Sequence, residues 1–191
     1  MNANKVVLVL DLDGTIIDQK VSDKLYTHAY CETLDKLKKN GINIPQELQT
    51  PSYDNFRRMA VERKDFLPIY TEVLKKVVKM YENEIRREEL RARSILGKLI
   101  EKYNPKDIYV LTANQEAPYI VGIILPSIPK EKVITINGVN YEEKEEILRK
   151  IKRNSEKVIY VANLEIDEKI AKNAEVEFFD VKNLERDLYG V

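Results

Sequence analysis

The chain lacks the features of a secreted or membrane-spanning protein. Its 191 residues include one cysteine, Cys31, so an internal disulfide is excluded and a reducing compartment is expected. Free cysteines behave as small apolar residues, and we expect Cys31 to be buried. No apolar run approaches membrane-spanning length, and no signal-peptide pattern precedes the first apolar segment. These absences predict a cytoplasmic protein without a membrane partner.

Net charge is absent too. Lys plus Arg and Asp plus Glu each number 32, so there is no general positive field to attract nucleic acid. Charged residues nevertheless make up 34% of the chain, and tryptophan is missing. A surface rich in Lys and Glu is typical of thermophilic proteins. The composition therefore argues against nucleic acid as a partner, and we expect a monomer or a homodimer.

Residues 6–15, Val-Val-Leu-Val-Leu-Asp-Leu-Asp-Gly-Thr, form the most informative segment. The unbroken apolar run predicts a central parallel strand buried on both faces, with Asp11 at its carboxyl end. Ligands of open α/β sheets bind at that end. In extended backbone Asp11 and Asp13 would point the same way, where they repel each other unless a cation or a shared proton is present. A plain turn is the alternative, because Asp and Gly favour turns.

The remaining chain alternates between helical and strand patterns from Leu90 onward, which predicts a doubly wound parallel sheet. The stretch 17–89 differs, because it has helical patterns and no convincing strand. We therefore predict an α/β core domain of residues 1–16 and 90–191, and an all-helical subdomain of residues 17–89. The predicted strands are Val6 to Leu10, Asp107 to Leu111, Lys132 to Ile136, Val158 to Val161 and Val176 to Phe179; the predicted helices of the insertion are Val21 to Lys39, Tyr53 to Lys64 and Phe66 to about Glu88.

The segment Asp11-Leu12-Asp13-Gly14-Thr15 after an apolar strand resembles motif I of the haloacid dehalogenase-like superfamily. Most members of that superfamily are magnesium-dependent phosphatases. The resemblance implies a Rossmann-like sheet with strand order 3-2-1-4-5, and it makes residues 17–89 a helical cap that closes over the active site. It also implies a small phosphorylated molecule as the substrate.

Two further positions match the superfamily pattern. Thr112 follows the second core strand, like the Thr or Ser of motif II, and its hydroxyl and the backbone amides at Ala113 and Asn114 would bind phosphoryl oxygens. Lys144 begins the helix before the fourth strand, like the motif III lysine that neutralises the aspartate and phosphate. Lys132 is the alternative cation.

The fourth motif departs from the pattern. The superfamily usually has an acid where this chain has Asn163, whereas Asp167 keeps the place of the second acid. The resemblance implies that Mg²⁺ is held by Asp11, the Asp13 carbonyl, Asn163 and Asp167, with Glu165 as a further candidate. A neutral amide binds Mg²⁺ less strongly than a carboxylate. Alternatively, Asn163 only turns the chain and Asp167 is an ordinary acid at a helix start.

The leading interpretation is phosphate-ester hydrolysis through an aspartyl-phosphate, with Asp11 as the nucleophile and Asp13 as the acid and base. A 2-haloacid dehalogenase is the nearest alternative, but a halide leaves without a proton, so an acid at Asp13 favours an oxygen leaving group. Phosphonate cleavage by a cap lysine is a lesser variant. A binding protein that has lost turnover is the alternative from another class, and the altered fourth motif supports it.

Several residues remain without an assigned role. Substrate identity cannot be read from the insertion, whose lone histidine, His28, is more typical of packing than of catalysis. The apolar stretch Tyr119 to Leu125 predicts a core helix rather than an interface.

Overall fold

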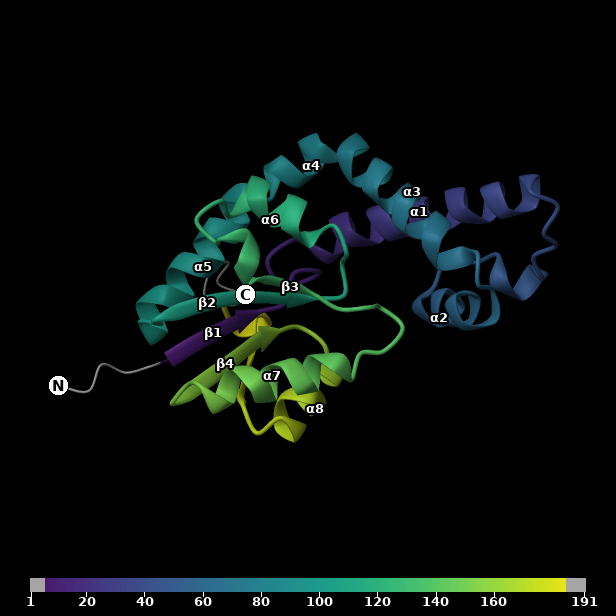
Figure 1. Cartoon of the computed structure of the whole chain (residues 1–191). Coiled ribbons are helices and arrows are strands. Elements are labelled where there is room, and N and C mark those ends of the chain that lie inside the picture. The colour runs from purple at the N-terminus through teal and green to yellow at the C-terminus, as the bar shows by residue number, and fades with distance from the viewer. Residues whose placement is uncertain (1–5, 185–191) are drawn as a thin grey trace.

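A computed structural model describes residues 6–184 and shows one five-stranded, all-parallel sheet (Figure 1). The strand order β3-β2-β1-β4-β5 confirms the predicted doubly wound α/β fold. Each predicted strand is present, and the ends of all five are shifted by one residue at most. Their bounds are β1 Val6–Leu10, β2 Asp107–Thr112, β3 Val133–Thr135, β4 Lys157–Ala162 and β5 Glu177–Asp180.

The central strand β1 is buried along its whole length. Val7 is in register with Asp107 of β2 on one side and with Val158 of β4 on the other. Alternate side chains belong to different apolar clusters, one on each face of the sheet. An unbroken apolar sequence is therefore required, because both faces of β1 are covered.

Helices cover the two faces of the sheet. Helices α7 (Glu143–Arg153) and α8 (Glu165–Asn173) contribute Leu148 and Ile170 to the cluster on one face. Helices α5 (Glu89–Tyr103) and α6 (Ala117–Ile124) contribute to the cluster on the other face. Ile120, Val121 and Ile124 of α6 are buried, and so is Leu125, which directly follows the helix. This stretch is therefore a core helix, as predicted.

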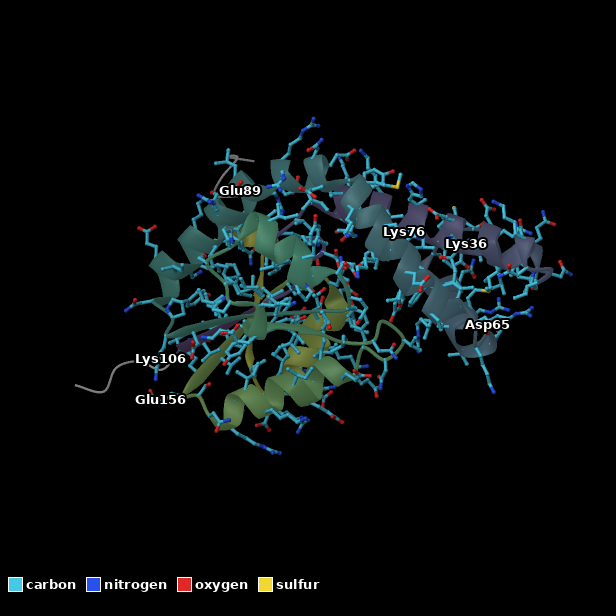
Figure 2. All side chains as sticks on the ribbon, turned by 45° about the horizontal axis from the view of Figure 1, so that its top comes forward. Lys36, Asp65, Lys76, Glu89, Lys106 and Glu156 are labelled. Atoms are coloured by element: carbon cyan, nitrogen blue, oxygen red, sulfur yellow. The ribbon has the colours of Figure 1, made fainter. Side chains whose placement is uncertain are left out.

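Residues 17–89 are helical wherever they form regular structure, apart from one isolated bridge between Asp13 and Ile17. Figure 1 shows α1 and α3 running side by side beyond the edge of the sheet, with α2 at their far end. This part carries many charged side chains, among them Lys36 and Lys76, which are labelled in Figure 2. The helices are α1 Gln19–Lys39, α2 Tyr53–Glu62, α3 Phe66–Met80 and α4 Glu82–Arg87; short 3-10 turns span Gln46–Leu48 and Lys130–Lys132.

The long helix predicted from Phe66 to about Glu88 is broken at Tyr81. The Tyr81 backbone leaves the helical region, with φ −94° and ψ 15°, and its ring packs edge-on against His28 of α1. The Tyr81 hydroxyl and His28 Nδ1 are also 3.2 Å apart. His28 therefore has a packing role, and the break lets the chain turn from α3 toward α5.

The expectation for Cys31 was wrong, because this side chain is exposed. Its neighbours Ala29, Tyr30 and Leu34 occupy the buried face of α1, and Cys31 falls outside that face. The start of the last predicted strand also differs. The Val176 amide donates to the Ala171 carbonyl and so completes the end of α8, which leaves Glu177 as the first strand residue.

Within residues 6–184, every helix is too short or too polar to cross a lipid bilayer.

Candidate active site

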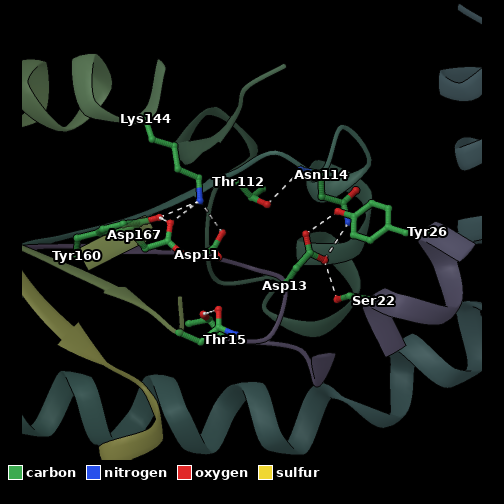
Figure 3. A network of polar contacts seen from close by, with 11 residues as sticks. Asp11, Asp13, Thr15, Ser22, Tyr26, Thr112, Asn114, Lys144, Tyr160 and Asp167 are labelled. Atoms are coloured by element: carbon green, nitrogen blue, oxygen red, sulfur yellow. Dashed lines mark hydrogen bonds and ion pairs between the residues drawn. The ribbon is translucent and has the colours of Figure 1, made fainter. Parts of the chain in front are cut away.

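Polar side chains gather at the carboxyl ends of β1, β2 and β4, around Asp11 (Figure 3). The Asp11 amide donates to the Val161 carbonyl, which extends the β1 to β4 pairing by one residue and fixes the Asp11 backbone. Lys144 reaches this point from α7, and Asp167 from α8. The sheet thus brings together residues that are more than 130 positions apart in the sequence.

Lys144 lies between two carboxylates. Its Nζ donates to Asp11 Oδ1 at 3.2 Å and to Asp167 Oδ1 at 3.1 Å. The Lys144 and Asp167 side chains have no exposed surface, and Asp11 is 3% exposed. Removing a charge from water is costly unless it is paired and hydrogen-bonded. The contact network explains how one ammonium and two carboxylates can share this interior.

Lys132, the alternative cation, lies elsewhere. It forms an ion pair with Asp107 at the start of β2, where the amino ends of the strands meet. Its ammonium also lies over the Tyr109 ring, 5.5 Å from the ring centre. The structure therefore places Lys144, and not Lys132, beside Asp11.

A fourth group in this network, Tyr160 of β4, was missed from the sequence. Its hydroxyl accepts from Lys144 Nζ at 2.9 Å and donates to Asp167 Oδ1 at 2.8 Å. The side chain is fully buried. A tyrosine inside an otherwise apolar strand is the signal that could have revealed it, because a buried hydroxyl needs a partner.

Burial shapes the electrostatics of this cluster. It raises the pKa of Asp11 from 3.8 to about 7, against the opposing effect of the Lys144 charge, and the negative charges of Asp167 and Asp13 add to the increase. Burial alone would lower the pKa of Lys144, but its anionic and tyrosine neighbours hold that pKa well above the ordinary value. Asp11 is thus a carboxylate whose negative charge Lys144 offsets only in part.

Asp13 has neutral partners. The strand ends at Leu10, so extended backbone does not continue to Asp13; the amides of residues 15, 16 and 17 all donate to the Leu12 carbonyl in a tight turn. The Asp13 carboxylate accepts from Ser22 Oγ at 2.8 Å, from the Tyr26 hydroxyl at 2.6 Å and from Asn114 Nδ2 at 3.3 Å. Ser22 and Tyr26 carried no signal in the sequence beyond their place on an amphipathic helix.

The residues after β2 are arranged differently from the sequence expectation. The Asn114 side chain holds Asp13 and accepts the Glu116 amide at 3.0 Å, so it is engaged within the protein. Thr112 Oγ accepts the Asn114 amide at 3.1 Å. Because this hydroxyl accepts a bond, its own proton is available to a ligand oxygen. Ala113, between them, is half-buried.

Gly14 permits the close approach of Asn163. Its φ of +71° lies in the left-handed region, and a Cβ there would collide with the side chains of Gln19 and Asn163. Asn163 Oδ1 lies 3.5 Å from the Thr15 hydroxyl, which donates to it. The glycine of the motif therefore brings the turn after β1 against the residue that follows β4.

The predicted magnesium ligands can be compared with the oxygens that are present. Asp167 Oδ2 is the one buried side-chain nitrogen or oxygen among the described residues without a hydrogen-bond partner. Within residues 6–184, no three His, Cys, Asp or Glu residues are grouped closely enough to hold a metal ion by themselves. Glu165, the further candidate ligand, is exposed. Mg²⁺ usually binds one or two carboxylates and keeps several waters. Asp11 and Asp167 offer two carboxylates and Asn163 offers an amide oxygen, which is a donor set of the kind that Mg²⁺ binds.

Comparisons with known proteins add little. No protein-family model and no curated protein matches this chain. Among solved structures, the chain is similar to one described as the structural characterization of the Mycobacterium tuberculosis Protein Tyrosine Kinase A (PtkA). The two share 15% identity with a TM-score of 0.48, over 94% of this chain and 84% of that one. A similarity of this degree indicates neither a substrate nor an activity.

Proposed function

We propose that this protein is a magnesium-dependent phosphatase of the haloacid dehalogenase-like superfamily, acting on a small phosphorylated metabolite. The contact between buried Lys144 and buried Asp11 at the carboxyl edge of the sheet carries this proposal. Strongly perturbed, buried ionisable groups at such an edge are typical of catalytic sites. Residues 17–89 would form the cap, and Asp13, Thr112 and Asp167 would complete the site.

The reaction would proceed in two displacements. An Asp11 carboxylate oxygen attacks phosphorus, the bond from phosphorus to the ester oxygen breaks, and Asp13 gives that oxygen its proton. Asp13 then takes a proton from water, whose oxygen attacks phosphorus and releases inorganic phosphate and free Asp11. Lys144 and the Thr112 hydroxyl would bind the phosphoryl oxygens throughout.

Asp11, the Asp13 carbonyl, Asn163 and Asp167 would hold the magnesium ion. When bound, the ion would offset the negative charge of the phosphoryl group and of the attacking carboxylate. Because Asn163 is a neutral ligand, we expect weaker metal binding than an acid at this position would give.

The proposal is tested with an aryl phosphate and purified protein, with magnesium and with a chelator. Asp11→Asn should lower phosphate release by about a thousandfold or more, because the nucleophile is lost. Asp107→Asn, which changes a carboxylate at the opposite edge of the sheet, should keep wild-type activity. Equal turnover by wild type and Asp11→Asn would refute the role of Asp11, and turnover that survives the chelator would refute the role of magnesium.

A 2-haloacid dehalogenase is the second candidate, favoured by Asn163 at the metal position and by the lysine that already lies between Asp11 and Asp167. Here Asp11 would attack the carbon that carries the halogen, the halide would leave, and water would hydrolyse the resulting ester. Halide release from a two-carbon haloacid in the presence of chelator, without phosphate-ester turnover, would replace the first proposal.

A further inference from the structure

Helix α1 directs two hydroxyl groups at the Asp13 carboxylate. Ser22 and Tyr26 are four residues apart and therefore lie on one face of the helix. Ser22 Oγ donates to Asp13 Oδ1, and the Tyr26 hydroxyl donates to Asp13 Oδ2 (Figure 3). Each carboxylate oxygen thus has its own donor from the same helix.

Among residues 6–184, the part of the chain outside α1 contributes one donor to this carboxylate. Asn114 Nδ2 is 3.3 Å from Asp13 Oδ1, a longer contact than either bond from α1. The turn fixes the Asp13 backbone through the Leu12 carbonyl, but it leaves the side-chain torsions free to rotate. The orientation of the carboxylate is therefore set mainly by α1.

Tyr26 remains a donor over the whole physiological range. Burial raises the pKa of the Tyr26 hydroxyl well above its ordinary value, and the negative charge of Asp13 adds to that increase. The hydroxyl therefore keeps its proton and gives none to the reaction. A carboxyl oxygen has two lone-pair sites, so Asp13 can accept from Tyr26 while it carries a proton for the substrate.

We propose that Tyr26 is a positioning residue, which holds Asp13 in the orientation needed to protonate the leaving-group oxygen, with Ser22 in support. The inference rests on the proposed phosphatase function. It also links the helical insertion to the chemistry, because the acid is correctly aimed only while α1 lies in place. Errors of about 1 Å in such positions reduce rates by about a hundredfold.

Leaving-group basicity provides the test. Phenyl phosphate and 4-nitrophenyl phosphate are close in shape, but phenolate is the more basic leaving group and depends more on a proton from Asp13. Tyr26→Phe should lower kcat/KM for phenyl phosphate by about thirtyfold and for 4-nitrophenyl phosphate by less than about threefold. The ratio of the two values is the readout, since general damage to the fold would lower both together.

Tyr30 offers a matched control. It lies one turn further along α1, is buried, and its hydroxyl donates to the Leu48 carbonyl at 2.7 Å instead of to the site. Tyr30→Phe should leave the substrate ratio unchanged. Ser22→Ala should shift the ratio in the same direction as Tyr26→Phe but less, which provides a second variant if Tyr26→Phe folds poorly.

A double-mutant cycle completes the experiment. In an Asp13→Asn background, Tyr26→Phe should change the ratio no further, because the group that it positions is gone. Equal slowing of both substrates by Tyr26→Phe and by Ser22→Ala would overturn the positioning role while leaving the phosphatase proposal intact. A wild-type protein that hydrolyses neither ester would overturn the proposed function, and this inference with it.

Discussion

The amino edge of the sheet, where the strands begin, and the carboxyl edge, where they end, differ in whether their ion pairs are exposed or buried. At the amino edge, Lys157 pairs with Glu177 at 2.6 Å while each side chain keeps nearly half of its surface in water, 48% and 46%. Figure 2 shows Lys106 and Glu156 at the same edge, pointing outward. At the carboxyl edge, Lys144 and its two carboxylate partners are enclosed by protein.

This difference shows where the molecule tolerates unfavourable free energy. An exposed ion pair contributes about 0–1 kcal/mol, so the amino edge neither gains nor loses much. A buried lysine with two carboxylates is often less stable than apolar residues of the same volume would be. Proteins keep such arrangements mainly where activity requires them, which supports the proposal of an active site at the carboxyl edge.

Replacing the buried lysine should have the largest effect. Lys144→Met leaves Asp11 and Asp167 facing each other without a cation, so we expect about a thousandfold loss of phosphatase activity and a loss of about 3 kcal/mol or more of unfolding free energy. Urea titration and an aryl phosphate assay measure both. Lys157→Met at the amino edge is the control and should change stability by less than about 1 kcal/mol. Similar effects from the two substitutions would remove the contrast between the edges.

The pH dependence of stability sharpens the same contrast. Because the pKa of Asp11 is raised from 3.8 to about 7, the folded protein binds this proton more tightly than the unfolded chain does. The Asp11 contribution to stability is therefore greatest below about pH 4, falls as the pH rises toward 7, and is constant above that. Asp11→Asn has no such loss, so its melting temperature relative to wild type should rise by about 10 °C between pH 4 and pH 8.

Melting curves in chelator measure this difference, and Asp107→Asn at the amino edge serves as the reference. If the difference in melting temperature between wild type and Asp11→Asn stays constant across this pH range, burial does not raise the pKa of Asp11.

The smallest expected effect concerns the metal. Asn163→Asp adds a carboxylate where the chain has an amide, so it should lower the magnesium concentration for half-maximal activity by about tenfold. Titration of activity with magnesium measures the shift. Because Asn163 also lies against Gly14 and Thr15, Asn163→Ser is the control for a change of shape without added charge. If Asn163→Asp leaves the magnesium concentration for half-maximal activity unchanged, the metal does not bind at this residue.

Most of the fold could be predicted from the sequence because its signals are local. The run Val6–Leu10 has the composition of a doubly covered strand, and the structure gives the same bounds. Later strands are recognisable for the same reason. The break at Tyr81 could not be predicted, because it depends on a ring contact with His28, 53 residues away in the sequence.

The candidate site likewise contains residues that the sequence reveals and residues that it does not. Asp11 follows a strand, Thr112 ends one, and Lys144 lies in the first turn of a helix, which are positions that a sequence pattern marks. The roles of Tyr26 and Tyr160 depend on which partner each hydroxyl meets in three dimensions, and helical or strand periodicity describes both only as members of a packed face.

The placement of β1 has a consequence for how the chain folds. Of the five strands of the sheet it is the first to be synthesised, yet its two neighbours are formed by residues 107–112 and 157–162. Non-local pairing of this kind slows folding, and an unpaired valine-rich strand is prone to aggregate while it waits. The position that sets Asp11 at the centre of the sheet thus means that the earliest of the five strands gains both of its neighbours only after residue 162 has been made.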